Sequence, residues 1–302
     1  APTGNDETSC DAARSLETWL IVVILSSLIL LGAAQIILRN FFSIGFAWGD
    51  GLPVALGSTL QPLERRTPTL LNLAWAPALF WDGRAESLED QAMSPIVNVA
   101  EMNMNADDMI SRLRDVSGYQ RLFARAYPGE TISQETVAKA LATFERSIVS
   151  AHAPFDRWIA GDAQAISPAA RRGFTLFTGK ARCSTCHTGW RFTDDGFYDV
   201  GVHDDDIGRG KVLPAIPLAQ YAFKTPTLRN VARRAPYLHD GSLRTLEQVI
   251  DLYDRGGMVQ RPSLSPEIKP LALTGEEKKD LVAFLEALTS HDAEVRVPTL
   301  PR

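Results

Sequence analysis

The sequence predicts a mostly α-helical fold with long irregular loops, preceded by a separate apolar helix. Three observations support this prediction. Helix-capping residues recur before apolar-periodic runs, strand signals are weak and scattered, and one long uncharged stretch lies near the N-terminus. The 302 residues have room for two modest domains, or for one domain and a membrane segment.

The uncharged stretch is the first element along the chain. Residues 19–38 carry no charged side chain, and a helix of that length spans about 30 Å, the thickness of a bilayer's hydrocarbon core. We therefore predict a transmembrane helix within residues 17–50, after a tail of residues 1–16. A buried helix of a soluble core and the apolar part of a targeting signal are the alternatives. Arg14 and Arg39 flank the stretch on both sides, so charge does not fix its orientation.

The remaining helices are predicted from their caps. Asn105 precedes a helix over residues 106–115, and Ser133 precedes an apolar-periodic run over residues 134–149. Ser167 supplies a cap before Pro168, which suits the first helical position.

Two capping boxes predict the last two helices, which run over residues 245 to about 254 and 274 to about 288. Proline-rich loops are expected at residues 190–236 and 256–273.

Composition excludes some functions. The net charge of −5 shows no basic excess, so nothing indicates a nucleic-acid partner. The three cysteines, at positions 10, 183 and 186, leave little scope for a disulfide framework and favour a cofactor.

The sequence RCSTCHTGW contains the chemistry-bearing motif. Cys183, Cys186 and His187 form a C-x-x-C-H run, the attachment pattern of c-type haem. On a helical turn these positions face one side, so both sulfurs reach the porphyrin while His187 reaches the iron. A redox dithiol and half of a zinc site are the alternatives, but no second C-x-x-C is present. Because c-type haem is attached outside the bacterial cytoplasm, the domain is predicted to be periplasmic.

The spacing of residues alone does not identify the second axial ligand of the haem iron. Downstream candidates are His203, His239, Tyr253, Met258 and His291. Methionine would raise the reduction potential, whereas a tyrosinate would stabilise ferric iron.

From about Gly51 onward the chain resembles the bacterial di-haem cytochrome c peroxidase and MauG-like family. The matching stretches cover most of the region in the family's order, at residues 66–96, 144–162, 173–189, 223–257 and 273–289. The resemblance implies a remnant of the N-terminal peroxidase-type domain at residues 51–160. It also implies a C-terminal cytochrome c haem domain at residues 161–302.

The resemblance also implies roles for single residues. Trp81 of the FWDGR motif matches the electron relay between two haems, and Gln91 and Glu101 match residues above the peroxide-binding haem. A carboxylate there can move a proton between the two peroxide oxygens. His239 matches the Y-x-H-D-G histidine near a haem, and Tyr253 takes the position of the distal ligand.

Tyr253 is therefore preferred to Met258 as the sixth ligand. A surface acid at Glu101, a solvated Gln91, a core aromatic at Trp81 and a packing tyrosine at 253 are the alternatives.

Three departures from the family alter the expectation. The apolar segment, around residues 41–42, stands where peroxidases carry a first C-x-x-C-H, and no cysteine lies between Cys10 and Cys183. One covalent haem c is therefore predicted. Arg66 and Arg234 replace an asparagine and a threonine of the family's calcium site, which argues against bound calcium.

The third departure is the apolar segment itself. Residues 17–50 resemble the first helix of the small membrane subunit of TRAP transporters, so the chain reads as a fusion joined near residues 49–52.

These features favour a mono-haem electron-transfer protein, anchored to the inner membrane and served by a small periplasmic electron-donor protein. The main alternative is a cytochrome c peroxidase that reduces hydrogen peroxide, or a MauG-like oxidase of a partner protein. A TRAP transporter accessory subunit is the remote alternative.

Overall fold

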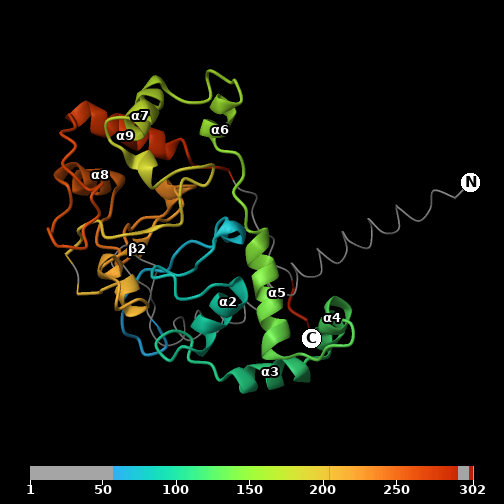
Figure 1. The fold of residues 1–302 in the computed structure, drawn as a ribbon. Coiled ribbons are helices and arrows are strands. Elements are labelled where there is room, and N and C mark those ends of the chain that lie inside the picture. The colour runs from blue at the N-terminus through green and yellow to red at the C-terminus, as the bar shows by residue number, and fades with distance from the viewer. Residues whose placement is uncertain (1–56, 204, 292–298, 302) are drawn as a thin grey trace, which may run out of the picture.

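The computed structural model describes residues 57–203, 205–291 and 299–301. These residues form helices joined by long irregular segments (Figure 1). The α-helices are α2 (Leu88–Val97), α3 (Ala106–Asp115), α4 (Ser117–Ala126), α5 (Gln134–Ser147), α6 (Pro154–Ile159), α7 (Pro168–Thr178), α8 (Leu246–Arg255) and α9 (Gly275–Glu286). The 3-10 helices are η1 (Leu73–Trp75), η2 (Cys183–Thr185), η3 (Arg209–Lys211), η4 (Pro217–Ala219) and η5 (Val231–Arg233).

The predicted caps are present in the structure. Side chains of Asn105, Ser133, Ser167, Thr245 and Thr274 each accept a hydrogen bond from the first turn of the helix that follows. Such bonds satisfy backbone N–H groups that have no partner inside the helix. The five predicted helices are therefore confirmed, with ends that differ by a few residues.

Three α-helices, α2, α4 and α6, were not predicted from the sequence. Helix α2 contains Pro95, which cannot donate a backbone hydrogen bond and ordinarily marks a helix end. Helix α4 follows Val116, a residue without a capping side chain, and α6 spans only six residues. Packing against the rest of the protein therefore stabilises helices that were not predicted from the local sequence.

The N-terminal group of helices packs around α5. Figure 1 shows α2, α3, α4 and α5 together at one end of the molecule. The apolar face of α5 meets α2 and α3, and the buried cluster between them comprises Ala92, Ile110, Leu113, Tyr119, Phe123, Ile132, Val137, Ala140 and Leu141. A smaller cluster joins Leu79, Ala85 and Leu88 to Ala142 of α5.

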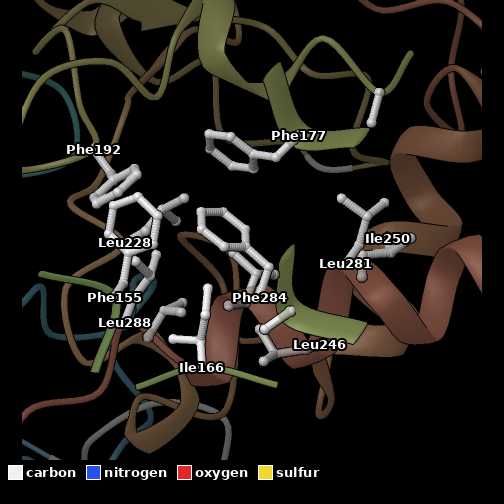
Figure 2. Packing of buried hydrophobic residues seen from close by; sticks show 14 of the residues in the cluster. Phe155, Ile166, Phe177, Phe192, Leu228, Leu246, Ile250, Leu281, Phe284 and Leu288 are labelled. Atoms are coloured by element: carbon white, nitrogen blue, oxygen red, sulfur yellow. The ribbon is translucent and has the colours of Figure 1, made fainter. Parts of the chain in front are cut away.

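The C-terminal group has a larger, aromatic core (Figure 2). Phe284 of α9 is fully buried, and its ring lies 4.9 Å from that of Phe177 on α7 and 5.4 Å from that of Phe155. Helices α7 and α9 approach closely because Gly173 has no side chain. A Cβ at that position would lie 1.9 Å from the carbonyl oxygen of Asp280.

The long loops behave largely as predicted. Residues 190–236 hold only short elements, among them the two-residue strands β1 (Phe197–Tyr198) and β2 (Phe223–Lys224), which pair antiparallel. The domain boundary predicted after residue 160 stays a prediction, although Phe155 already packs in the C-terminal core.

The predicted transmembrane helix at residues 19–38 lies outside the described residues. Within residues 57–203 and 205–291, no helix is both long enough and apolar enough to cross a bilayer.

Candidate functional site

A cavity of about 940 Å³ lies between the two groups of helices and draws its wall from both. Its volume is at the upper end of the range of about 300–1,000 Å³ that ligand sites occupy. The predicted site residues that line this cavity are Trp81, Gln91, Glu101, Cys183, Cys186, His187, His239 and Tyr253. The structure thus brings together residues that are far apart in the sequence, while their chemical roles stay predictions.

The C-x-x-C-H run forms a tight helical turn in the cavity wall. The backbone N–H of His187 donates to the carbonyl oxygen of Cys183 at 2.9 Å, which stacks the two residues one turn apart. The ring atom Nδ1 of His187 donates to the carbonyl oxygen of Phe192 at 2.9 Å. This bond fixes the ring orientation and leaves Nε2 unprotonated, as a metal-binding histidine requires.

The two thiols fit a haem attachment site. Both cysteines are free, and burial raises the pKa of Cys183 to about 12 and that of Cys186 to about 11. In the described part of the chain no three His, Cys, Asp or Glu side chains cluster as a metal site. The donor set therefore fits haem thioethers with one axial histidine.

Tyr253 and Met258, the two candidates for the second axial ligand, lie in different surroundings. Tyr253 is on α8, lines the cavity and is enclosed by protein, and burial raises the pKa of its hydroxyl, with the two nearby cysteines adding to this effect. Met258 is 51% exposed and is not part of the cavity wall. Position alone therefore favours Tyr253.

Trp81 joins the two halves of the cavity wall. Its ring is buried, its indole N–H donates to the carbonyl oxygen of Arg66 at 2.7 Å, and its carbonyl oxygen accepts from the backbone of Lys224 at 2.8 Å. The ring of His239 lies 6.4 Å away, edge-on to Trp81, and stacks on Phe223 at 3.5 Å. An aromatic contact therefore runs across the wall from one group of helices to the other.

Gln91 and Glu101 occupy the α2 side of the cavity. The side-chain oxygen Oε1 of Gln91 is buried and has no hydrogen-bond partner among the residues that the structure describes. Glu101 follows α2 in a short loop, and its Oε1 accepts from Nδ2 of Asn98 at 2.8 Å. A buried polar atom without a partner costs free energy, so an unpaired amide oxygen on a cavity wall points to a ligand group that would pair with it.

Sequence reasoning missed an ionic cluster at the cavity edge. The guanidinium of Arg65 bridges the buried carboxylates of Asp82, at 2.6 Å, and Asp206, at 2.5 Å. Burial alone would lower the pKa of Arg65, but the hydrogen bonds to the two carboxylates raise it. Arg65 and Asp206 are 141 positions apart, so no local sequence pattern could have predicted this contact.

The helical architecture and the Cys183–Cys186–His187 turn define a protein of the c-type haem class. Comparison with known proteins narrows this class. Residues 43–164 match the family model described as di-haem cytochrome c peroxidase, and residues 170–289 match that of cytochrome c. The chain belongs to the di-haem cytochrome c peroxidase and MauG family. The match begins at residue 43, somewhat before Gly51, where the sequence resemblance was placed.

Curated relatives support this membership. The chain is 52% identical over 257 residues to the methylamine utilization protein MauG of Methylorubrum extorquens, a match that covers 84% of this chain and 72% of the relative. It is 46% identical to MauG of Methylophilus methylotrophus, over 84% of this chain and 76% of that one. It is 30% identical to cytochrome c551 peroxidase of Pseudomonas aeruginosa, over 86% and 74%.

Solved structures agree. A MauG-like protein associated with microbial copper homeostasis superposes with a TM-score of 0.72 at 31% identity, over 80% of each chain. The di-haem peroxidase BthA of Burkholderia thailandensis, at 21% identity, shows the same fold with a TM-score of 0.68.

These findings correct the predicted haem content. The match of residues 43–164 to the di-haem cytochrome c peroxidase model and of residues 170–289 to the cytochrome c model points to two haem c groups, so the prediction of one haem and of a mono-haem electron carrier is wrong. The prediction counted C-x-x-C-H runs, and a count of one local motif missed what the whole two-part architecture indicates. The resemblance of residues 17–50 to a TRAP subunit lies outside the described residues and stays a prediction.

Proposed function

We propose that the protein is a periplasmic di-haem oxidoreductase that activates hydrogen peroxide in the MauG-like manner. The observation that carries this proposal is the single cavity that unites the haem attachment turn, Tyr253, Trp81 and the Gln91–Glu101 pair. Haem bound there would supply the redox-active iron. The periplasmic setting follows from the covalent attachment of c-type haem, and residues 19–38 are proposed to tether the chain to the inner membrane.

Cys183 and Cys186 would hold one haem through thioether bonds, and His187 and Tyr253 would serve as ligands to its iron. The bond from His187 to the carbonyl of Phe192 keeps the imidazole ring in one orientation. Bound as a tyrosinate, Tyr253 would favour the oxidised states of the iron, because a hard anionic ligand stabilises higher charge.

Glu101 would act on peroxide as a general acid and base. Its carboxylate takes the proton from one peroxide oxygen and returns it to the other, which then leaves as water. Asn98 restrains this carboxylate, and the unpaired oxygen of Gln91 offers an acceptor for a peroxide O–H. The overall reduction consumes one peroxide, two electrons and two protons and yields two waters.

Trp81 would relay the electrons. It lies between the two groups of helices, and its indole contacts His239, which neighbours the haem side of the wall. The two electrons come from a small periplasmic donor protein in the peroxidase mode, or from a partner protein that is itself oxidised in the MauG mode. Tyr253 favours the second mode, since the family's typical peroxidases carry methionine at its position.

Substitution of Glu101 tests the peroxide chemistry. In the purified holoprotein, Glu101→Gln is expected to lower the rate of peroxide consumption by about 10²–10⁴-fold, the usual contribution of a general acid–base. Glu130→Gln, an exposed acid outside the cavity wall, is the matched control and should keep the wild-type rate. Peroxide turnover that survives Glu101→Gln unchanged would contradict the proposal.

A further inference from the structure

Two arginines on the cavity wall differ from the other cations around it. Most cationic side chains of the wall pair with a carboxylate of the protein; these are Arg65, Arg84, Arg182, Arg191, Lys211 and Lys224. Lys269 has no such partner within residues 57–203, 205–291 and 299–301, but it is exposed. Arg66 and Arg234 are half-buried, and among the described residues neither has a carboxylate partner.

The side chain of Arg66 is held against the backbone of Arg234. The guanidinium of Arg66 donates a hydrogen bond to the carbonyl oxygen of Arg234. The backbone of Arg66 is fixed as well, because its N–H donates to the carbonyl of His239 at 2.6 Å and its carbonyl accepts from the indole of Trp81. Arg234 directly follows η5, and its N–H donates to the carbonyl of Val231 at 3.0 Å. The backbones of both arginines and the side chain of Arg66 are therefore fixed in the cavity wall.

This arrangement is electrostatically unfavourable as it stands. Burial and, to a lesser extent, the neighbouring charge of Arg234 lower the pKa of Arg66 to about 10, although Tyr237 acts in the opposite direction. Burial also lowers the pKa of Arg234. Buried charges are normally paired, since removing them from water without a counter-charge costs free energy. Two half-buried guanidinium groups on one cavity wall, with no carboxylate partner among the described residues, therefore favour an anion within the cavity.

We propose that Arg66 and Arg234 form a binding site for the propionate carboxylate of a haem in this cavity. The planar guanidinium presents parallel N–H donors that match both oxygens of a carboxylate. The haem implied by the attachment turn carries carboxylates on its periphery, and the arginines share one cavity with that turn. This inference rests on the proposed function only in requiring haem in the cavity, and it requires no peroxide chemistry.

A positive pair beside a haem has a measurable consequence. Cationic charge disfavours the ferric state relative to the ferrous state, so it raises the reduction potential of a nearby haem. It also fixes the propionate in one hydrogen-bonded geometry. Loss of either charge should therefore lower the reduction potential and change the vibrations of the propionate.

The experiment compares Arg66→Gln and Arg234→Gln with Arg233→Gln in the holoprotein. Arg233 is adjacent in sequence, exposed and outside the cavity wall, so it is the matched control. The two test variants are expected to shift one haem's reduction potential downward in spectroelectrochemical titration and to shift the propionate-bending band in resonance Raman spectra. The control should leave both unchanged.

The possible outcomes decide between sources of the carboxylate. Unchanged potential and unchanged propionate band in both test variants would overturn the proposal. A response to added acetate at fixed ionic strength, with the propionate band unmoved, would assign the pair to a free carboxylate and overturn it as well.

A second pair of variants covers the case in which the glutamine variants do not fold. Arg66→Lys and Arg234→Lys keep the positive charge but lose the planar guanidinium with its parallel N–H donors. The propionate band should therefore shift, while the reduction potential of the haem stays near that of the wild type. An unmoved band in the lysine variants would also overturn the proposal. Peroxide turnover is measured separately, so failure of the peroxidase chemistry would not be mistaken for failure of this site.

Discussion

The two sides of the cavity are built in different ways. The turn that carries Cys183 and His187 is backed by an aromatic core in which Phe177, Phe192 and Phe284 are buried (Figure 2). The side that carries Gln91 and Glu101 consists of a ten-residue helix and a short loop. A well-packed core keeps an attachment turn in place, whereas the α2 side offers polar groups to the cavity. The contrast matches the proposed division between holding the cofactor and acting on peroxide.

The largest expected effect is loss of haem from the rigid side. Replacing Cys183 and Cys186 together with alanine removes both thioether bonds, so the pyridine haemochrome assay should fall by one haem c per chain. Thr185→Ala, an exposed position between the two cysteines, is the control and should keep the wild-type haem content. An unchanged haem content in the double variant would show that this turn is not an attachment site.

The next effect concerns the core behind the turn. Gly173→Ala places a Cβ where the carbonyl oxygen of Asp280 lies 1.9 Å away, so α7 and α9 must move apart. Overpacking of this kind costs about 1–3 kcal/mol. The melting temperature by circular dichroism should fall clearly. For comparison, Gly275→Ala has open space around the added methyl group and should be nearly neutral. Equal melting temperatures for the two variants would mean that the helices are not packed this closely.

The difference between the two sides of the cavity also explains which features could be predicted from the sequence. The haem turn was readable because its chemistry demands a fixed local spacing, and capped helices were readable because a cap acts within one turn. The Gln91–Glu101 side was found only through family spacing, since α2 has Pro95 inside it. The contact of Arg66 with Arg234 joins residues 168 positions apart, and no local pattern encodes it.

The haem count failed for a related reason. Counting C-x-x-C-H runs uses only local information, whereas the match to the di-haem cytochrome c peroxidase model extends over residues 43–164. A match of that length concerns a whole domain, which a count of one five-residue motif does not take into account.

The smallest expected effect concerns a buried acid in the N-terminal group of helices. Glu145 on α5 is 6% exposed, and its oxygen Oε2 has no hydrogen-bond partner in the described part of the chain. Arg146 is next to it but is engaged by Glu89, with bonds of 2.8 and 2.9 Å. Burial therefore raises the pKa of Glu145 from 4.5 to about 7. The N-terminal helices thus contain a buried acid that is uncompensated, unlike the aromatic core of the C-terminal group.

This shift sets a direction for the dependence of stability on pH. Below pH 4.5 the carboxyl of Glu145 is protonated in the folded and unfolded states, so it adds no dependence. As pH rises from 4.5 to about 7, the unfolded chain releases the proton more readily than the folded one, so stability falls, and above 7 the loss is constant. Glu145→Gln should remove this loss and stabilise the protein at pH 8 by about 1–3 kcal/mol.

The measurement is the difference in unfolding free energy between variant and wild type at pH 5 and pH 8. Taking a difference cancels the titration of all other groups, including those around the haems. Glu135→Gln, on the same helix but 73% exposed, should give a difference close to zero at both values. If Glu145→Gln gave the same difference at pH 5 and pH 8, the acid would be ionised in the folded state. The N-terminal group would then contain a counter-charge or water at Glu145, and the two cores would differ less in kind than in size.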